Sequence, residues 1–354
     1  MKIILPIAIF LAALALLLPL LLSNQRSGDH LKEDNPSEIS QIAAEPESTF
    51  FTYPLQNDNT LPSLDNAADA NVSLRLFSGG KTQTLTLRDY LIGVVAAEMP
   101  ASFEPEALKA QAAAARTYTY YRVNHAQSNG VHPDADTCDD PMHCKAWLSD
   151  NALRDKWGGS YTVNIEKITE AVDNTDGMLV MFDGEPILAV FHSSSGGNTE
   201  DSSNVWSKQL PYLQSVDSPE TADSVPDFET AVTLSTSEFR LTALAEYPEM
   251  SLSGSSADWF KDVKRSDAGR IISLSLGGVT LTGTELRLLF GLRSANITWV
   301  IADGSITFNV VGYGHGVGLS QYGANELAKQ GMGYKDILLY YYRGSDVCPL
   351  SVSG

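Results

Sequence analysis

The sequence has little positive charge. It contains 24 lysine and arginine residues against 43 aspartate and glutamate residues, which gives a formal net charge of −19. A field of this sign opposes the approach of nucleic acids and of anionic membrane surfaces, so we expect neither as a partner. The 354 residues are enough for one large domain or two of ordinary size, with a substantial core.

Several motifs are also absent. No internal repeat is evident, and the glycine-rich segments have no adjoining Lys-Ser or Lys-Thr pair, which argues against a phosphate-binding loop. The three cysteines are Cys138, Cys144 and Cys348, and the sequence indicates no partner for the last of them.

One long apolar run lies at the start of the chain, from Ile3 to Leu22, interrupted only by two prolines. At about 1.5 Å per residue it spans roughly 30 Å, the thickness of the hydrocarbon core of a bilayer. A cleaved signal peptide is the alternative, but its apolar part is normally shorter and ends at a small-x-small site, which residues 20–24 lack. We therefore expect a signal anchor at 1–23, with a single membrane span at about 3–22 and the rest of the chain outside the cytoplasm. Residues 24–71 are polar, acidic and punctuated by prolines, which predicts a disordered linker.

The folded part is predicted to begin at residue 72. Alternating apolar and polar residues at 72–77 and 82–87 flank a Ser-Gly-Gly turn, which predicts a hairpin. A helix is expected from about 86 to the residues before Pro100, and an alanine-rich stretch predicts a second one from Pro105 to about Arg122. Strands are expected at 178–182, 187–191, 271–276 and 279–281, and helices at 283–290 and 321–330. This mixture predicts an α+β fold.

Glu98 is the strongest candidate for a chemical role. The apolar residues 94–97 precede it and Met99 and Pro100 follow, so little near it in sequence can solvate a charge. It also lies at the C-terminal end of the first predicted helix, where the macrodipole disfavours an anion. Both effects predict a raised pKa, as a general acid needs. A helix-end glutamate that points into solvent is the alternative.

A candidate metal site lies in a loop rich in aspartate and proline. Its residues are His132, Cys138, His143 and Cys144. Two thiolates and two imidazoles complete a tetrahedral zinc sphere with no position left for water, so one structural zinc ion is predicted. A Cys138–Cys144 disulfide is the alternative, because such bonds are natural outside the cell.

Four blocks of the sequence resemble the stage II sporulation protein D family, which also includes the amidase enhancers. They are VVAAEMPASFEPEALKAQAAAARTY at 94–118, the segment 176–206, GTELRLLFGLRS at 283–294 and the segment 312–344, in the order of the family. The resemblance spans nearly all of the chain beyond residue 72. It implies one membrane-anchored catalytic domain at 72–346 with a substrate groove and a variable inserted subdomain at about 219–295. Some members carry zinc on two cysteines and two histidines, with a spacing similar to the one found here.

The resemblance implies a lytic transglycosylase. Such an enzyme would cut peptidoglycan glycan strands, preferably those stripped of stem peptides, during engulfment in a spore-forming bacterium. Glu98 occupies the family's catalytic position, and this single carboxylate would protonate the glycosidic oxygen and then accept the proton of the 6-hydroxyl of muramic acid, giving a 1,6-anhydro ring. Most glycosidases need two carboxylates, and no second carboxylate motif is evident.

Two other functions remain open at this point. One is a non-catalytic amidase enhancer that binds peptidoglycan and activates a partner amidase, and the other is an ordinary hydrolase that uses a distant carboxylate. The expected partners of the protein are glycan strands, a sporulation amidase-endopeptidase and a membrane scaffold protein.

Six further residues are candidates for substrate binding: Arg116, Tyr118, Ser195, Lys208, His315 and Gln321. For Arg116 the alternative is a structural ion pair. Ser195 lies in a loop of serines and glycines that suits close approach of a sugar, or that forms a tight turn without contacts. His315 lies where glycine alternates with larger residues at 312–318, and its alternative is a structural histidine bonded to the backbone.

Overall fold

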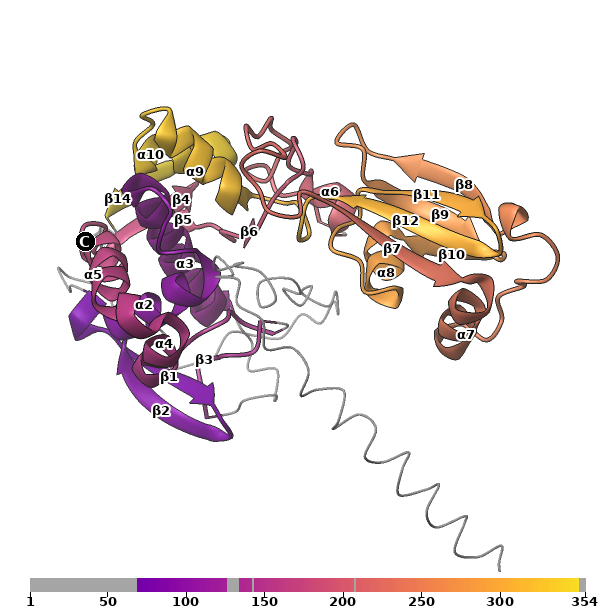
Figure 1. Ribbon diagram of the computed structural model, residues 1–354. Helices are drawn as coiled ribbons and strands as arrows, with labels where there is room; N and C mark the ends of the chain where they lie inside the picture. The colour runs from indigo at the N-terminus through magenta and orange to yellow at the C-terminus, as the bar shows by residue number, and fades with distance from the viewer. Residues whose placement is uncertain (1–68, 126–133, 142, 207, 350–354) are drawn as a thin grey trace, which may run out of the picture. The chain divides into compact units, whose positions relative to one another are not determined.

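A computed structural model describes residues 69–125, 134–141, 143–206 and 208–349 (Figure 1). The expected anchor at 1–23 and all but the last three residues of the expected linker lie outside these ranges, as does His132. No helix within the described ranges is both long enough and apolar enough to cross a membrane. Asp69–Asn71, the end of the expected linker, forms the short 3-10 helix η1, in which Asp69 is buried.

The folded part opens with the predicted hairpin. Strands β1 (Ser73–Ser78) and β2 (Lys81–Thr86) pair antiparallel, and β1 also pairs in parallel with β3 (Thr137–Cys138). Helix α2 (Leu87–Glu98) begins where expected, because the Thr86 hydroxyl accepts a hydrogen bond from the Asp89 N–H at 3.0 Å. It ends at Glu98 because Met99, which precedes Pro100, is extended.

Helix α3 (Pro105–His125) is the centre of the first hydrophobic core. It packs against α2, α5 (Tyr161–Asp173), β4 (Met178–Phe182), α9 (Gln321–Lys329) and α10 (Tyr334–Tyr341) (Figure 1). Its buried alanines at 107, 110 and 112–115 explain how so many neighbours fit, since a methyl side chain lets helices approach closely. The alanine-rich run is therefore a core element as well as a strong helix former.

Small sheets and short helices complete this part. The sheets have the orders β14-β4-β5 and β13-β6. The other elements of this part are α4 (Asp150–Trp157), η2 (Gly158–Ser160), β5 (Glu185–Pro186), β6 (Phe191–His192), α6 (Ser202–Val205), β13 (Leu319–Ser320) and β14 (Asp346–Pro349). The expected strand at 187–191 is wrong except at its end, because the backbone of 187–190 forms no strand ladder: Ala189 N–H donates to Ile187 O within the segment, and Leu188 N–H donates to the Tyr212 hydroxyl. The apolar run reflects burial in the core and not a strand ladder.

A second hydrophobic core is formed by residues 229–311. Two antiparallel sheets have the orders β11-β12-β7 and β10-β9-β8. The elements are β7 (Glu229–Ser235), α7 (Thr236–Glu246), η3 (Ser256–Asp258), β8 (Phe260–Arg265), β9 (Ile271–Leu276), β10 (Val279–Thr282), α8 (Gly283–Leu289), β11 (Ile297–Ala302) and β12 (Ser305–Val311). Phe239 stacks on Phe290 at 4.5 Å in their centre. The region overlaps the expected subdomain at 219–295 and extends past it, because β11 and β12 belong to the same sheet as β7.

Candidate functional site

Glu98 is buried at the end of α2. Its exposed fraction is 1%, so the side chain does not point into solvent, which was the alternative that the sequence left open. The helix ends there, and the Met99 N–H closes the last turn on Val95 O at 2.9 Å. The carboxylate is therefore held in the first hydrophobic core at the point where the chain turns from α2 toward α3.

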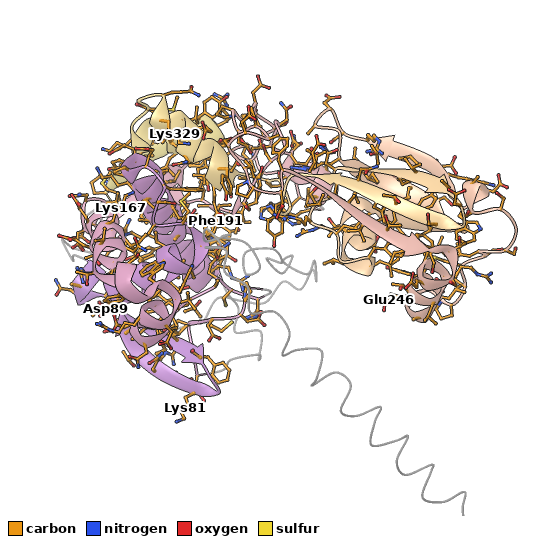
Figure 2. All side chains as sticks on the ribbon, in the orientation of Figure 1. Lys81, Asp89, Lys167, Phe191, Glu246 and Lys329 are labelled. Carbon is orange, nitrogen blue, oxygen red and sulfur yellow. The ribbon has the colours of Figure 1, made fainter. Side chains whose placement is uncertain are left out.

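A buried ammonium group accompanies Glu98. Lys145 follows the cysteine loop and is 4% exposed. Its Nζ lies 4.3 Å from the ring centre of Tyr118 and 3.8 Å from that of Phe191, which is labelled in Figure 2. Burial lowers the pKa of Lys145 to about 8, and the nearby charge of Glu98 acts in the opposite direction. The site thus contains a buried carboxylate and a buried cation that lies on two aromatic faces and is influenced by the charge of the carboxylate.

Tyr118 belongs to the same cluster. It is 6% exposed, and burial raises its pKa to about 12, with the charges of Cys144 and Glu98 adding to the effect. Its hydroxyl therefore stays protonated at neutral pH. Tyr118 lies on α3 and Phe191 in β6, so these two elements hold the Lys145 ammonium, whose pKa the charge of Glu98 raises.

His315 and His192 form the next layer of the site. Their rings are 5.5 Å apart, and the Trp206 ring lies 5.6 Å from that of His315. His315 Nδ1 accepts from Val317 N–H, so Nε2 carries the proton and donates to Phe191 O at 3.1 Å. His192 is fully buried, and burial together with Arg270 lowers its pKa to about 3. Both imidazoles are therefore neutral, and His315 has the backbone bonds of the structural alternative.

The alternating glycines bring the backbone close to other parts of the chain. A Cβ at Gly314 would lie 2.8 Å from His192 Cβ, and one at Gly316 would overlap the guanidinium of Arg270. Both residues have positive φ, 109° and 86°. Alternating glycines allow either a ligand or another part of the chain to approach the backbone closely. In the structure the groups they admit are the chain's own His192 and Arg270.

Ser195 lies in a buried hydrogen-bond network. It is 1% exposed, and its hydroxyl donates to Glu220 Oε1 at 2.6 Å. Ser320 donates to the same oxygen at 2.6 Å, and Ser218 donates to the other. The serine loop is thus fixed by a buried carboxylate.

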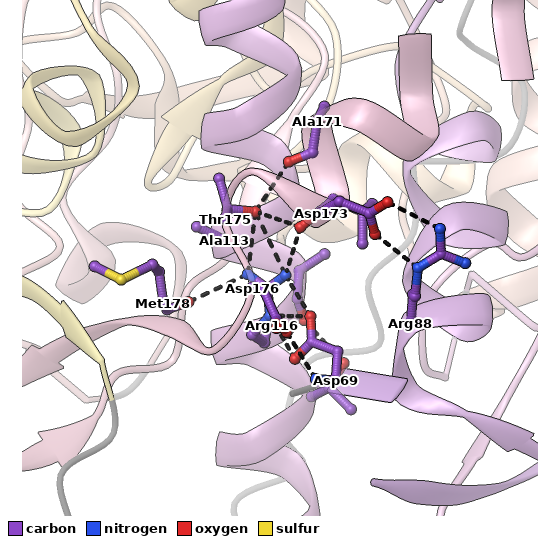
Figure 3. Close-up of polar contacts among 12 residues, drawn as sticks. Asp69, Arg88, Ala113, Arg116, Ala171, Asp173, Thr175, Asp176 and Met178 are labelled. Atoms are coloured by element: carbon purple, nitrogen blue, oxygen red, sulfur yellow. Dashed lines mark hydrogen bonds and ion pairs between the residues drawn. The ribbon is translucent and has the colours of Figure 1, made fainter. Parts of the chain in front are cut away.

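Arg116 makes the ion pair that the sequence left as its alternative. It is fully buried, and its Nη2 lies 2.6 Å from Asp69 Oδ2. The guanidinium also donates to Met178 O at 3.2 Å (Figure 3) and to Val172 O at 3.3 Å. These bonds tie η1 to α3, to the end of α5 and to β4, and they leave the guanidinium no exposed surface for a substrate.

The last two substrate candidates lie in different surroundings. Gln321 is fully buried at the start of α9, where its Nε2 donates to Gln111 Oε1 of α3 at 3.5 Å. Lys208 is exposed, two residues after Trp206. Of the six candidates, only Tyr118 and His315 share the cluster around Lys145 and Phe191.

Three of the four expected metal ligands come together. The donor atoms of Cys138, His143 and Cys144 lie within 4.8 Å of one another. Both sulfurs are 3.4 Å from His143 Nδ1, and the two cysteines are not joined by a disulfide. A hydrogen bond from the Cys138 thiol lowers the pKa of Cys144. Two sulfurs and an imidazole fit zinc, for which His132, outside the described residues, would be the fourth ligand.

Comparison with known proteins identifies the family. The family model described as "Stage II sporulation protein" matches residues 78–182. The chain is 35% identical over 342 residues to Stage II sporulation protein D of Bacillus subtilis (strain 168), covering 95% of this chain and 93% of that protein. It is 37% identical over 270 residues to Stage II sporulation protein D of Bacillus amyloliquefaciens, 76% of each chain. The Amidase enhancer of Bacillus subtilis (strain 168) is 29% identical over 307 residues, 72% of this chain and 40% of that protein. These likenesses define a sporulation protein. The chain belongs to the stage II sporulation protein D family.

Sequence reasoning missed Lys145, Phe191 and Trp206. Lys145 follows Cys144 in a polar loop, where a lysine side chain is normally exposed to solvent. Phe191 and Trp206 lie within the segment 176–206 that resembles the family. The neighbouring sequence does not distinguish an aromatic side chain that packs in a core from one that contacts a cation. Only Glu98 had a local signal, its unbroken apolar surroundings.

Proposed function

We propose that this protein is a peptidoglycan lytic transglycosylase that uses Glu98 as both acid and base. The observation that carries the proposal is the buried Glu98 carboxylate, whose charge acts on the buried Lys145 ammonium, within the segment that matches the family model. A carboxyl group removed from water at the end of a helix suits proton transfer to a leaving oxygen. The preferred substrate is a glycan strand whose stem peptides have been removed.

The proposed reaction needs one proton carrier. Glu98 donates its proton to the glycosidic oxygen, and the bond between this oxygen and C1 of muramic acid breaks. The Glu98 carboxylate then accepts the proton of the 6-hydroxyl while O6 bonds to C1, which closes the 1,6-anhydro ring. Lys145, fixed on the rings of Tyr118 and Phe191, supplies a constant positive charge near the carboxylate during its anionic stage.

We also propose that the cysteine loop holds one structural zinc ion. Cys138, His143 and Cys144 would ligate it together with His132, and the closed sphere would leave no metal-bound water. The ion would fix the loop that leads directly into Lys145. Its contribution would therefore be to stability and to the position of the ammonium group.

Location and partners complete the proposal. The apolar run at 3–22 would anchor the protein as a single span of the cell membrane, with the catalytic domain outside the cytoplasm. A preference for stripped strands requires an amidase that acts first, and a membrane scaffold would hold both enzymes at one place.

The likeness to the amidase enhancer supports a second candidate function. In that case the chain would bind peptidoglycan and activate a separate amidase without cutting glycan itself. The buried Glu98 would then have only a structural role. Replacing Glu98 therefore distinguishes the two functions, because it abolishes glycan cleavage only if the protein is a transglycosylase.

The test replaces Glu98 by glutamine in the full chain. We expect loss of cleavage of stripped glycan by about 10²–10⁴-fold, because one group serves both proton transfers. Glu166→Gln is the matched control, since it makes the same charge change on the exposed face of α5. Mass spectrometry should find 1,6-anhydromuramic ends, one water lighter than hydrolysis products. Reducing ends as the main product, or more than a tenth of wild-type turnover in folded Glu98→Gln protein, would reject the proposal.

A further inference from the structure

The ammonium group of Lys145 makes no hydrogen bond or ion pair with another described residue. Its Nζ lies 3.8 Å from the ring centre of Phe191 and 4.3 Å from that of Tyr118. A ring face attracts the charge of an ammonium, but it does not replace the acceptors that three N–H groups have in water. The residue is 4% exposed, and Nζ is not among the described polar atoms that are both sealed from solvent and without a partner. The exposed area of Lys145 therefore includes its charged tip.

The hydroxyl of Tyr118 is in the same situation. The residue is 6% exposed, its hydroxyl has no hydrogen-bond partner in the described ranges, and the oxygen is not sealed from solvent. Because burial raises the pKa of Tyr118 to about 12, the hydroxyl keeps its proton and is available as a donor. The ring that lies against Lys145 thus carries a second donor without an acceptor.

Arg122 brings another positive charge to the same place. It is half-buried on α3, one turn after Tyr118 and therefore on the same face of the helix. Its Nη2 donates to His143 O at 3.4 Å, and it belongs to none of the ion pairs found among the described residues. The charge of Arg122 acts on both Lys145 and Tyr118. We call Lys145, Arg122 and Tyr118 the basic cluster.

The basic cluster has more positive than negative charge around it. Glu98 is the carboxylate whose charge acts on Lys145, so it offsets one of the two cations. Cys144 also acts on Lys145, but a zinc ion bound in the cysteine loop would neutralise a thiolate there. A cation that is removed from water without an anionic partner is costly. One further anion would therefore stabilise the cluster.

The acidic character of the whole chain makes the basic cluster an exception. The formal net charge is −19, so the long-range field repels anions. An anionic ligand must then be held by cations at short range, and salt screens buried charges much less than exposed ones. Two cations without carboxylate partners, one of them influenced by the charge of Glu98, fit a substrate that carries an anionic group.

We propose that Lys145 and Arg122 bind one carboxylate group of the substrate, with the Tyr118 hydroxyl as a further donor. An ammonium carries three donors that rotate about the end of its chain, so it can meet a carboxylate oxygen without fixing the plane of the ligand. Resting on the proposed function, we infer that this carboxylate is the lactyl group of muramic acid, which is free only after the stem peptide has been removed. A strand with peptides has an uncharged amide there, so the basic cluster would favour stripped strands.

The test measures binding without turnover. Full-length Glu98→Gln protein is titrated with a stripped glycan tetrasaccharide and with the same compound whose lactyl carboxylates have been converted to amides. We expect the free acid to bind about tenfold more tightly or better, which is the lower end for a hydrogen bond to a charged group. In wild-type protein the same preference should appear in KM rather than in kcat. Equal affinities for acid and amide would overturn the proposal, and this comparison changes no residue of the basic cluster.

Variants of the cluster locate the site. Lys145→Met removes the charge and keeps a long apolar chain against the rings, so it should lower the affinity for the acid to that for the amide and leave the amide unchanged. Lys145→Arg keeps the charge and should keep the preference. The control Lys264→Met removes an exposed lysine of β8 and should change neither affinity. Loss of both affinities alike in folded Lys145→Met protein would show a structural role and overturn the proposal.

Arg122 has its own comparison. Arg122→Gln should reduce the preference for the acid, whereas Arg240→Gln, which removes an exposed arginine of α7, should leave it intact. An unchanged preference in Arg122→Gln would remove Arg122 from the site.

A last arm identifies the source of the carboxylate. Acetate should compete only weakly, because it makes none of the sugar contacts, and competition as strong as that of the tetrasaccharide would reject the lactyl assignment. Failure of this inference differs from failure of the proposed function. A preference for the acid in wild-type protein that does not cleave glycan would reject the transglycosylase and keep the carboxylate site, and cleavage without the preference would do the reverse.

Discussion

Replacing Arg116 by methionine tests whether this residue is structural or binds substrate. Its guanidinium is fully buried and paired with Asp69, which is itself 3% exposed (Figure 3). Removal of one partner of a buried pair leaves the other charge desolvated, which costs about 3–5 kcal/mol. We therefore expect Arg116→Met to lose this much stability, a large fraction of the total for an ordinary domain.

The stability that the Arg116→Met variant loses should depend on pH, and the titration of Asp69 sets the direction of this dependence. Burial already raises the pKa of Asp69 in spite of Arg116. Without the arginine the folded state would bind a proton there more readily than the unfolded state, so the stability of the variant should fall as pH rises above the ordinary range of an aspartate. Adding Asp69→Asn removes the charge, so the double variant should recover most of the loss.

Urea unfolding of the full chain measures these free energies, and glycan cleavage is assayed where each variant is folded. Arg88→Met is the matched control. It breaks the exposed pair Arg88–Asp173, whose side chains are 33% and 46% exposed, so it should cost less than about 1 kcal/mol. The reasoning is refuted if Arg116→Met is as stable as Arg88→Met and still cannot cleave glycan, because Arg116 would then act on the substrate.

Three further predictions follow from buried contacts. Gly316→Ala should destabilise the protein in thermal unfolding by about 1–3 kcal/mol more than Gly278→Ala, which shares the positive φ but has nothing near its Cβ position. Burial lowers the pKa of His192 to about 3 from 6.5, so the free energy of unfolding should fall by up to about 5 kcal/mol as the pH drops from 6.5 to 3. A pH series of urea unfolding measures this decrease, and it should be absent in His192→Gln. For the proposed zinc site, metal analysis should find one ion per chain, and chelation and the Cys138→Ser substitution should lower the melting temperature by similar amounts. Metal-free protein in which Cys138 and Cys144 resist alkylation until a reductant is added would establish the disulfide instead.

The elements that the sequence predicted have local signals. The hairpin at 73–86 follows from alternation around Gly79 and Gly80, and α2 begins at the Thr86 cap. Helix α10 and strands β11 and β12 were missed. The two strands do have a local signal, because Ile306, Phe308 and Val310 alternate with polar residues and Asp303-Gly304 forms the turn of the β11–β12 hairpin. What has no local signal is that β12 becomes a central strand by pairing with β7, about 75 residues earlier in the chain. Pairing at that separation is a tertiary event that propensity cannot predict.

The same limit applies to the candidate site. Glu98 was identified because its apolar neighbours are adjacent in sequence, and the structure buries it. Its cation comes from residue 145 and the ring on which that cation lies from residue 191, so neither has a local signature. Ser195 shows the opposite case. Its loop suggested a contact with a sugar, but its hydroxyl donates a hydrogen bond to the carboxylate of Glu220, 25 residues later in the chain.

The alternating glycines of 312–318 show what a motif does and does not specify. Their spacing correctly indicated that something approaches the backbone closely, but not that the approaching groups are His192 and Arg270. Because Gly316 lies against the guanidinium and Ser195 O accepts from Nη2, Arg270 is held in one orientation. A side chain at position 316 would displace the guanidinium and break this hydrogen bond, so the packing of the arginine is enough to require a glycine there.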